Sequence, residues 1–375
     1  MFSLIAPTTN RDEKPVNLDL STSLQLIGRS LEFQRIVEIL TQDGDLLITG
    51  VPGSGRRTLV RIAAQEVSAV VLDIDCIRAT DGERFLHLLA EAINQSWEAK
   101  KIEKWVNQSA SEFFIFNTES KLKLLRSLNQ KQLWQAFIIL VELLQTMAND
   151  LDQRVVLILQ SFPHIRSWDR HSLWESKFRQ EVKDHPHVSY VLLATIGETS
   201  NHTDENSYSI ETIQLAPLAK DVLALWARKI LHTENLKFDP HSKALQIFLD
   251  AVQGNVGDAM TLIRRLLTLQ HHQGLITEQE IQQVIEGMLK DLSITYESLL
   301  MLLPASQIHL LECLAIDPTD KPQSKEYIQK HGLSRGGSLQ GGLTGLQNKG
   351  LIYNAEQGYR LTLPLLALWL RQRLN

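Results

Sequence analysis

The stretch 47-LITGVPGSGRRTLV-60 decides the fold of this chain. An apolar run ends at Gly50, a glycine-rich turn follows, and a helical pattern begins after it. The spacing of Gly50 and Gly55 matches G-x-x-x-x-G-K-[ST], the loop whose backbone N–H groups cradle phosphates between a strand and a helix. Arg56 and Arg57, however, stand where this pattern has Lys and then Ser or Thr. The predicted loop comprises Gly50, Pro52, Gly53, Ser54, Gly55, Arg56, Arg57 and Thr58.

The two arginines change what this loop can bind. Arg56 keeps the positive charge of Lys, but its guanidinium is longer, planar and differently hydrated. Arg57 cannot ligate Mg²⁺, and the hydroxyl of Thr58 comes one residue late, about 100° further around the helix. A backbone cradle and two guanidiniums can still hold phosphates. We therefore expect weak binding of ATP or ADP, without an effective Mg²⁺ site and without another metal site.

Three further apolar runs predict the rest of a central sheet. They are 69–75, 154–162 and 188–195, and helical patterns fill most of the chain between residues 82 and 150. Strands that are apolar on both faces and alternate with helices are typical of a parallel sheet covered on both sides. The sequence therefore predicts an α/β fold of the P-loop NTPase type, with helices on both faces of a parallel sheet.

The character of the chain changes after residues 210–219. Only helical patterns follow as far as residue 290, separated by a loop at 232–240; they are 221–231, 241–252, 256–270 and 277–289. Near the C-terminus, a glycine-rich helical pattern places Leu339, Leu343 and Leu346 on one face. The next piece, 351–364, alternates and contains a turn, which indicates a two-stranded wing.

The order of these motifs resembles the AAA+ ATPases, nearest to the archaeal-type group related to the origin-recognition proteins. In that family a Gly-Arg turn lines the adenine pocket, and Gly28 and Arg29 match it in 27-IGRSLEF-33. Thr195 falls at the polar sensor position. The ending 359-YRLTLPLLALWLR-371 is similar to that of the family's winged-helix domain. The resemblance implies an N-terminal arm (1–22), a AAA+ P-loop nucleotide-binding domain (23–218), an all-α lid (219–292) and a winged-helix domain (293–375).

The same resemblance implies that catalytic groups are missing. In the family, the third strand ends in Asp-Glu, which hold Mg²⁺ and polarise the attacking water, whereas here Gln160 and Ser161 stand there. Gly257 replaces the lid Arg that contacts the terminal phosphate, with Arg264 and Arg265 two turns further on. Phosphoryl transfer depends on positioning and charge neutralisation, so these losses at one centre indicate that hydrolysis is no longer needed.

The winged-helix resemblance implies contact with DNA. Such a domain places its recognition helix in the major groove, and here that helix would lie within 334–352. Its many glycines leave a thin contact surface, which suits close packing against the backbone of either DNA or protein. We therefore expect protein partners and consider DNA a second partner. The candidate DNA contacts are Lys325, Arg335, Ser338, Gln340, Lys349 and Arg360.

Composition sets the remaining limits. With 375 residues, 43% hydrophobic and 22% charged, the chain is typical of a globular protein of two or three domains. A formal net charge of −5 argues against coating nucleic acid through bulk charge. Cys76 and Cys313 alone cannot build a disulfide scaffold, which favours the cytoplasm. We expect neither a signal peptide nor a membrane span, because no apolar run approaches roughly 18 residues.

Three functions stay open at this point. The first, which we favour, is a degenerate AAA+ protein: a pseudo-ATPase that binds nucleotide without efficient hydrolysis and acts as a DNA- or protein-binding subunit of a DNA-transaction complex. The second is an active but atypical ATPase that uses Arg56 and Thr58, with Asp73, Asp75 or Glu198 as the acid. The third is a winged-helix transcription regulator.

Overall fold

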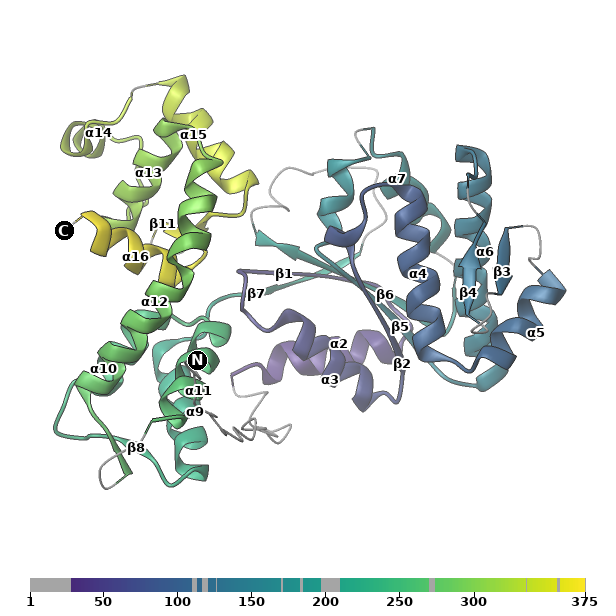
Figure 1. Cartoon of the computed structure of the whole chain (residues 1–375), viewed down its shortest axis with the longest axis horizontal. Helices are drawn as coiled ribbons and strands as arrows, with labels where there is room; N and C mark the ends of the chain where they lie inside the picture. The colour runs from purple at the N-terminus through teal and green to yellow at the C-terminus, as the bar shows by residue number, and fades with distance from the viewer. Residues whose placement is uncertain are drawn as a thin grey trace, which may run out of the picture.

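The computed structural model shows an α/β core joined to a largely helical part that carries the C-terminus (Figure 1). The predicted arm, the start of the motif at 27–33, Glu198 and Arg335 lie outside the described residues. The residues that the structure describes are 28–109, 113–116, 121–125, 127–169, 171–182, 185–196, 210–269, 274–334, 336–355 and 358–374.

Five parallel strands form the core sheet, in the order β2-β5-β6-β1-β7. Four of them fall on the predicted apolar runs, because strands buried on both faces need apolar side chains in both directions. The fifth, β7, was not expected from the sequence pattern. The strands are β1 (Leu46–Gly50), β2 (Val70–Asp75), β5 (Val155–Gln160), β6 (Val188–Thr195) and β7 (Glu211–Leu215).

The register of the strands gathers the candidate residues at one edge of the sheet. Gly50 at the end of β1 lies opposite Thr195 at the end of β6. Asp75 at the end of β2 lies opposite Gln160 at the end of β5. Because the carboxyl ends of parallel strands share one edge, the loop after β1 lies beside the polar ends of the other strands.

Helices cover both faces of the sheet, and alternate strand residues serve the two faces (Figure 1). Ile48, Ile158 and Val191 belong to the core under α2 and α3. Leu157 and Leu192 belong to the core under α4, α6 and α7. The two-sided parallel sheet that the sequence predicts is thus confirmed. The helices are α2 (Ser30–Thr41), α3 (Arg56–Glu66), α4 (Gly82–Ser96), α6 (Gln130–Leu151) and α7 (Leu173–Glu181).

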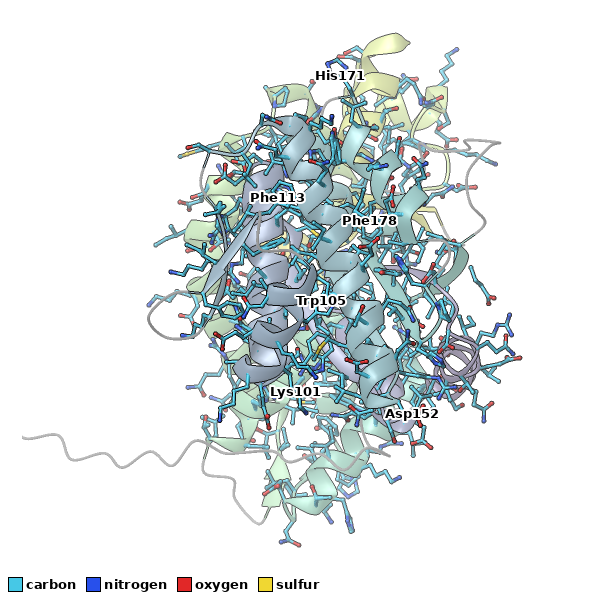
Figure 2. All side chains as sticks on the ribbon, turned by 90° about the vertical axis from the view of Figure 1, so that its right-hand side faces the viewer. Lys101, Trp105, Phe113, Asp152, His171 and Phe178 are labelled. Atoms are coloured by element: carbon cyan, nitrogen blue, oxygen red, sulfur yellow. The ribbon has the colours of Figure 1, made fainter. Side chains whose placement is uncertain are left out.

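A short hairpin interrupts the region that was expected to be mostly helical. Its strands, β3 (Phe114–Phe116) and β4 (Leu122–Leu124), pair antiparallel, and three-residue strands are too short for a sequence pattern to reveal. The side-chain amide of Asn94 exchanges two hydrogen bonds of 2.9 Å with the backbone of Leu122 and so fixes the hairpin to α4. Figure 2 looks onto this side of the core, where Trp105 belongs to α5 (Ala99–Ser109).

The lid is close to the helices predicted for it. One difference is a parallel pairing of two residues each, β8 (Lys237–Phe238) with β9 (Leu275–Ile276), inside a part expected to be helix and loop only. A second is that the last helix runs unbroken through residue 292, where the boundary with the winged-helix domain was expected. The lid helices are α9 (Lys220–Thr233), α10 (Ala244–Val252), α11 (Val256–Leu267) and α12 (Glu278–Met301).

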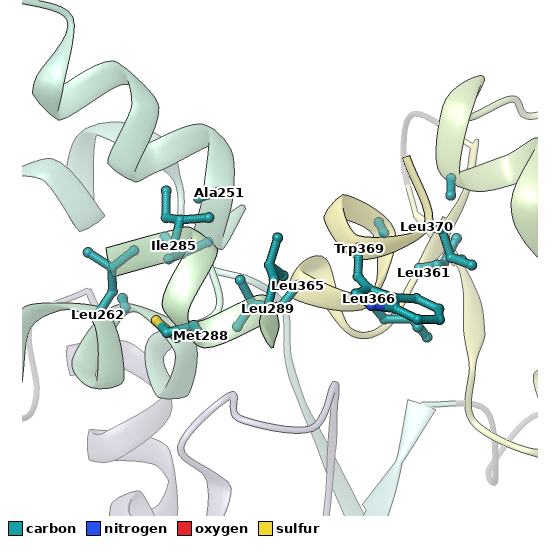
Figure 3. Close-up of a cluster of buried hydrophobic side chains, with 14 of the residues drawn as sticks. Ala251, Leu262, Ile285, Met288, Leu289, Leu361, Leu365, Leu366, Trp369 and Leu370 are labelled. Atoms are coloured by element: carbon teal, nitrogen blue, oxygen red, sulfur yellow. The ribbon is translucent and has the colours of Figure 1, made fainter. Parts of the chain in front are cut away.

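In the described part of the C-terminal domain, three helices are followed by a two-stranded wing and then by a last helix. Leu339, Leu343 and Leu346 are all buried, which confirms that they share one face of α15. Leu289 of α12 lies beside Leu365 of α16, so the lid and this domain share one continuous core (Figure 3). The elements are α13 (Ala305–Ile316), α14 (Lys325–His331), α15 (Gly337–Asn348), the antiparallel pair β10 (Ile352–Ala355) and β11 (Gly358–Leu361), and α16 (Pro364–Leu374).

None of the helices within the described ranges is both long and apolar enough to cross a lipid bilayer.

Candidate functional site: the phosphate loop and its surroundings

The loop between β1 and α3 has the strand–loop–helix context that the sequence predicts. Gly53 and Gly55 have left-handed backbones, with φ of 80° and 86°, which side chains with a Cβ rarely adopt. Helix α3 begins at Arg56, so its free N–H groups face the loop. Ser54 is 3% exposed, and its Oγ has no hydrogen-bond partner among the residues that the structure describes. The backbone cradle for an anion is therefore present.

The lid lies directly on this loop. Asn255 donates from Nδ2 to the carbonyl of Pro52 at 2.8 Å, and its Oδ1 accepts from the backbone of Asp258 at the start of α11. The backbone N–H of Gly257 donates to the carbonyl of Gly53 at 2.9 Å. We call these bonds the lid–loop contact. They fix the start of α11 against the loop.

The glycine at the lid-arginine position is part of this arrangement. A Cβ on Gly257 would lie 3.1 Å from the Cα of Gly53, so a side chain there would press the lid away from the loop. From sequence, Gly257 is recognisable only as a missing arginine, and Asn255 was not identified as a site residue. The signal available was the pair 254-GN-255 before a helix, because Asn is a favoured N-cap.

Arg56 occupies the place of the Lys but turns towards the sheet. Its guanidinium donates to the carbonyl of Ala194 at the end of β6. The next residue, Thr195, lies against the winged-helix domain, since a Cβ on Gly350 would be 3.3 Å from Thr195 Oγ1. The sensor position thus lies at a contact between the core and the C-terminal domain.

Arg57 joins a closed polar group around Asp73 of β2. Arg57 Nε lies 2.6 Å from Asp73 Oδ2, and Arg61 Nη1 lies 3.1 Å from the same oxygen. Gln160 donates from Nε2 to Asp73 Oδ1 at 2.5 Å. We call these four side chains the Asp73 cluster. Asp73 Oδ2 therefore accepts two hydrogen bonds from guanidiniums, and Asp73 Oδ1 accepts one from Gln160.

A magnesium ion does not fit this donor set. Mg²⁺ requires six oxygen ligands at about 2.0–2.1 Å, of which proteins usually supply one or two carboxylates. Asp73 is the carboxylate in the cluster, and it is engaged by two cations. Asp75 accepts a hydrogen bond from Ile77 N and caps the short helix that follows β2. Among the described residues, no group of three or more His, Cys, Asp or Glu could hold a metal.

Two cavities border the loop. The smaller, of about 180 Å³, is lined by the loop residues from Gly53 to Thr58 together with Gln160, Ser161 and Leu193; we call it the phosphate pocket. The larger, of about 730 Å³, runs from Val51 of the loop to Arg360 of the wing. The sheet edge therefore offers an opening of phosphate size beside the altered motif residues, and a larger one beneath the winged-helix domain.

The Gly-Arg turn, which consists of Gly28 and Arg29, packs against the start of the lid. Gly28 has φ of 75° and packs so closely on Val222 of α9 that a Cβ would overlap it. Arg29 is buried and forms an ion pair with Glu32 at 3.0 Å. Its guanidinium also donates to the carbonyl of Ala216, just after β7. These contacts join α2 to the start of the lid.

The candidate DNA-binding residues differ in how exposed they are. Ser338 and Gln340 are exposed on α15, and Lys325 is exposed at the start of α14. Lys349 is also exposed, with its Nζ 2.8 Å from Gln307 Oε1. Arg360, in contrast, is only partly exposed and lines the larger cavity. Lys325, Ser338 and Gln340 are thus all exposed, and we call the surface that carries them the exposed face of α14 and α15.

Comparisons with known proteins agree with this architecture. A family model described as "Probable winged helix domain" matches residues 294–372. A Walker-type ATPase of Pyrococcus abyssi superposes with a TM-score of 0.65 at 16% identity, over 92% of this chain and 96% of that one. The ORC2 protein of Aeropyrum pernix, solved as ADPNP–ADP complexes, gives a TM-score of 0.55 at 14% identity, over 97% of both chains. No curated protein sequence matches the chain.

These findings define the fold. The chain has a P-loop core with parallel strands, a lid and a C-terminal winged-helix domain. It has the fold of the AAA+ ATPases of the origin-recognition type, as the sequence resemblance predicts.

Proposed function

We propose that this protein is a pseudo-ATPase: it binds a nucleotide at the phosphate loop and does not hydrolyse it efficiently. The observation that carries this proposal is the Asp73 cluster. At the position where hydrolysis needs a metal-binding hydroxyl, Arg57 instead forms an ion pair with Asp73. Gln160 and Ser161, which line the same pocket, cannot replace an acid that polarises water.

Binding of a nucleotide is supported separately from its hydrolysis. The left-handed glycines, the start of α3 and two arginines form a positively charged cradle for phosphates. The ORC2 protein of Aeropyrum pernix, which shares the fold, is described as complexes with ADPNP and ADP. We therefore propose ATP or ADP as the ligand here.

A role in a DNA-transaction complex is the second part of the proposal. It rests on the winged-helix domain and on the exposed face of α14 and α15, which carries Lys325, Ser338 and Gln340. The glycines of α15 allow close approach on two sides. A Cβ on Gly341 would have no atom within 4 Å, whereas Gly345 packs against Gln307 of α13.

We place the protein in the cytoplasm, because its two cysteines are free and buried.

Binding and release of inorganic phosphate, measured on one preparation, test the proposal. Equilibrium titration with a fluorescent ATP analogue is expected to give saturable binding, and phosphate release in excess Mg²⁺ is expected to stay at the level of the Arg56→Ala variant. Phosphate release that is well above background and is lost in Arg56→Ala favours an active, atypical ATPase. Saturable binding must also be outcompeted by unlabelled ATP.

A further inference from the structure

We propose that Arg57 takes the place of Mg²⁺ in the phosphate pocket, so that a nucleoside di- or triphosphate binds with its terminal phosphates against this guanidinium and without a metal ion. The inference rests on the proposed function, because it specifies how the loop holds its ligand. It goes beyond nucleotide binding as such, because relatives with an intact motif bind the nucleotide together with a metal ion.

Among the described residues, Arg57 is held in position through its Nε alone. Its Nε forms the 2.6 Å bond to Asp73 Oδ2, and Asp73 is oriented from its other oxygen by Gln160. The two Nη groups of Arg57 have no hydrogen-bond partner among the described residues, and the side chain is 52% exposed. Arg57 lines the phosphate pocket, so these free N–H donors are available to an anion there.

The charges around the pocket favour an anion. Asp73 carries one negative charge against the two positive charges of Arg57 and Arg61, so the Asp73 cluster is positive by one unit. The partial positive charge at the start of α3 adds to this. A guanidinium presents paired N–H donors that match two phosphate oxygens.

An independent feature also points to a ligand inside the loop. Ser54 Oγ is buried without a partner, and it would lie 2.6 Å from a Cβ placed on Gly50. It thus points into the turn of the loop rather than towards solvent. A buried hydroxyl without a partner is costly, and an oxygen of a bound phosphate is a suitable acceptor for it.

The structure makes a metal and Arg57 mutually exclusive. A divalent cation would have to approach Asp73 between two guanidiniums and displace at least one of them. The gain from one carboxylate would be offset by repulsion from the freed arginine. Nucleotide binding is therefore expected to need no Mg²⁺, and excess Mg²⁺, which binds the same phosphates in solution, is expected to weaken it.

Titration of the full-length protein with N-methylanthraniloyl-ADP, in excess EDTA and in excess Mg²⁺, tests this inference. The natural chain is expected to bind in EDTA at least as tightly as in excess Mg²⁺. Arg57→Ala is expected to lower the affinity in EDTA by about tenfold or more, the value of a hydrogen bond to a charged group. Arg61→Ala is the matched comparison: it removes the same charge from Asp73, but Arg61 does not line the phosphate pocket, so it should lower the affinity for ADP much less than Arg57→Ala does.

The outcomes separate this inference from the proposed function. Binding that disappears in EDTA overturns the inference and leaves the nucleotide site in place. Binding in EDTA that Arg57→Ala leaves unchanged, or that Arg61→Ala weakens equally, also overturns it. No binding in either buffer overturns both proposals. Arg57→Gln, which keeps an N–H donor for Asp73 and removes the charge, repeats the test if the alanine variant does not fold.

Discussion

Asn255 of the lid and Pro52 of the phosphate loop are joined by a hydrogen bond of 2.8 Å, across 203 positions of the chain. The same Asn255 side chain caps α11 through its Oδ1. One amide therefore sets both the start of the lid helix and its distance from the loop. These bonds couple the loop to the lid, and the predictions for the stability of both follow from that coupling.

Two substitutions of Asn255 distinguish its hydrogen bond to Pro52 from its cap of α11. Asn255→Ala loses both and leaves the Pro52 carbonyl unpaired, so we expect a loss of about 2 kcal/mol in the free energy of unfolding. Asn255→Asp keeps an equally good helix cap but cannot donate to Pro52, and it turns a carboxylate towards that carbonyl. Both variants should therefore be destabilised in urea titrations at neutral pH. If the aspartate variant is as stable as the natural chain, the bond to Pro52 contributes nothing.

Adding a methyl group to Gly53 should disrupt the lid–loop contact. A Cβ there would overlap Asn255 Oδ1, and φ of 80° is strained for alanine. We expect Gly53→Ala to lower the free energy of unfolding by about 1–3 kcal/mol. Gly341→Ala is the control, because it lies in α15 with open space around its Cβ position and should add up to about 1 kcal/mol of stability through helix propensity. Equal effects of the two substitutions would contradict the close approach of lid and loop.

Stability should depend on pH through Asp258, which follows the lid–loop contact on α11. Burial raises its pKa from an ordinary value of 3.8 to about 6. The folded chain then binds more protons than the unfolded chain between these values, so this residue lowers stability as pH rises from about 4 to 6. We expect Asp258→Asn to remove that decline and to increase the free energy of unfolding at pH 7.5 by about 2 kcal/mol. Thermal unfolding across this pH range checks the prediction. An unchanged pH profile in the variant would contradict the raised pKa of this partly buried carboxyl.

The exposed face of α14 and α15 should carry the proposed DNA binding. Few basic side chains lie there, so we expect modest affinity with a log–log salt slope of about −1 to −3. Lys325→Glu should weaken binding and reduce that slope, whereas Lys100→Glu on α5 makes the same charge change on the core. Fluorescence anisotropy with duplex DNA at several salt concentrations compares them. Equal weakening by Lys100→Glu would mean that bulk charge, rather than this face, governs the binding.

The sequence predicted the fold well because its motifs are local and ordered. The apolar runs before Gly50, Gln160 and Thr195 identify three strands directly, since each is buried on both faces. The hairpin and the β8–β9 pairing escaped because two or three residues give no periodicity.

The site was only half visible in the sequence. The loop follows from glycine spacing, but the Asp73 cluster joins residues of three separate elements, α3, β2 and β5. From sequence, Asp73 is one of three candidates for the missing acid of an atypical ATPase, because nothing in a linear pattern shows which donors already surround a carboxylate. The role of Asn255 likewise depends on a contact between lid and loop that no local pattern contains.

Single-turnover analysis of ATP is the most direct test of the central claim. The protein is held in molar excess over ATP with Mg²⁺ present, and the nucleotide is separated by chromatography after prolonged incubation. We predict that ATP is recovered intact, as it is from the Arg57→Ala variant and from buffer alone. Conversion of the bound ATP to ADP by the natural chain, abolished by Arg56→Ala, would contradict a pocket that has kept its phosphate cradle and lost the groups for cleavage.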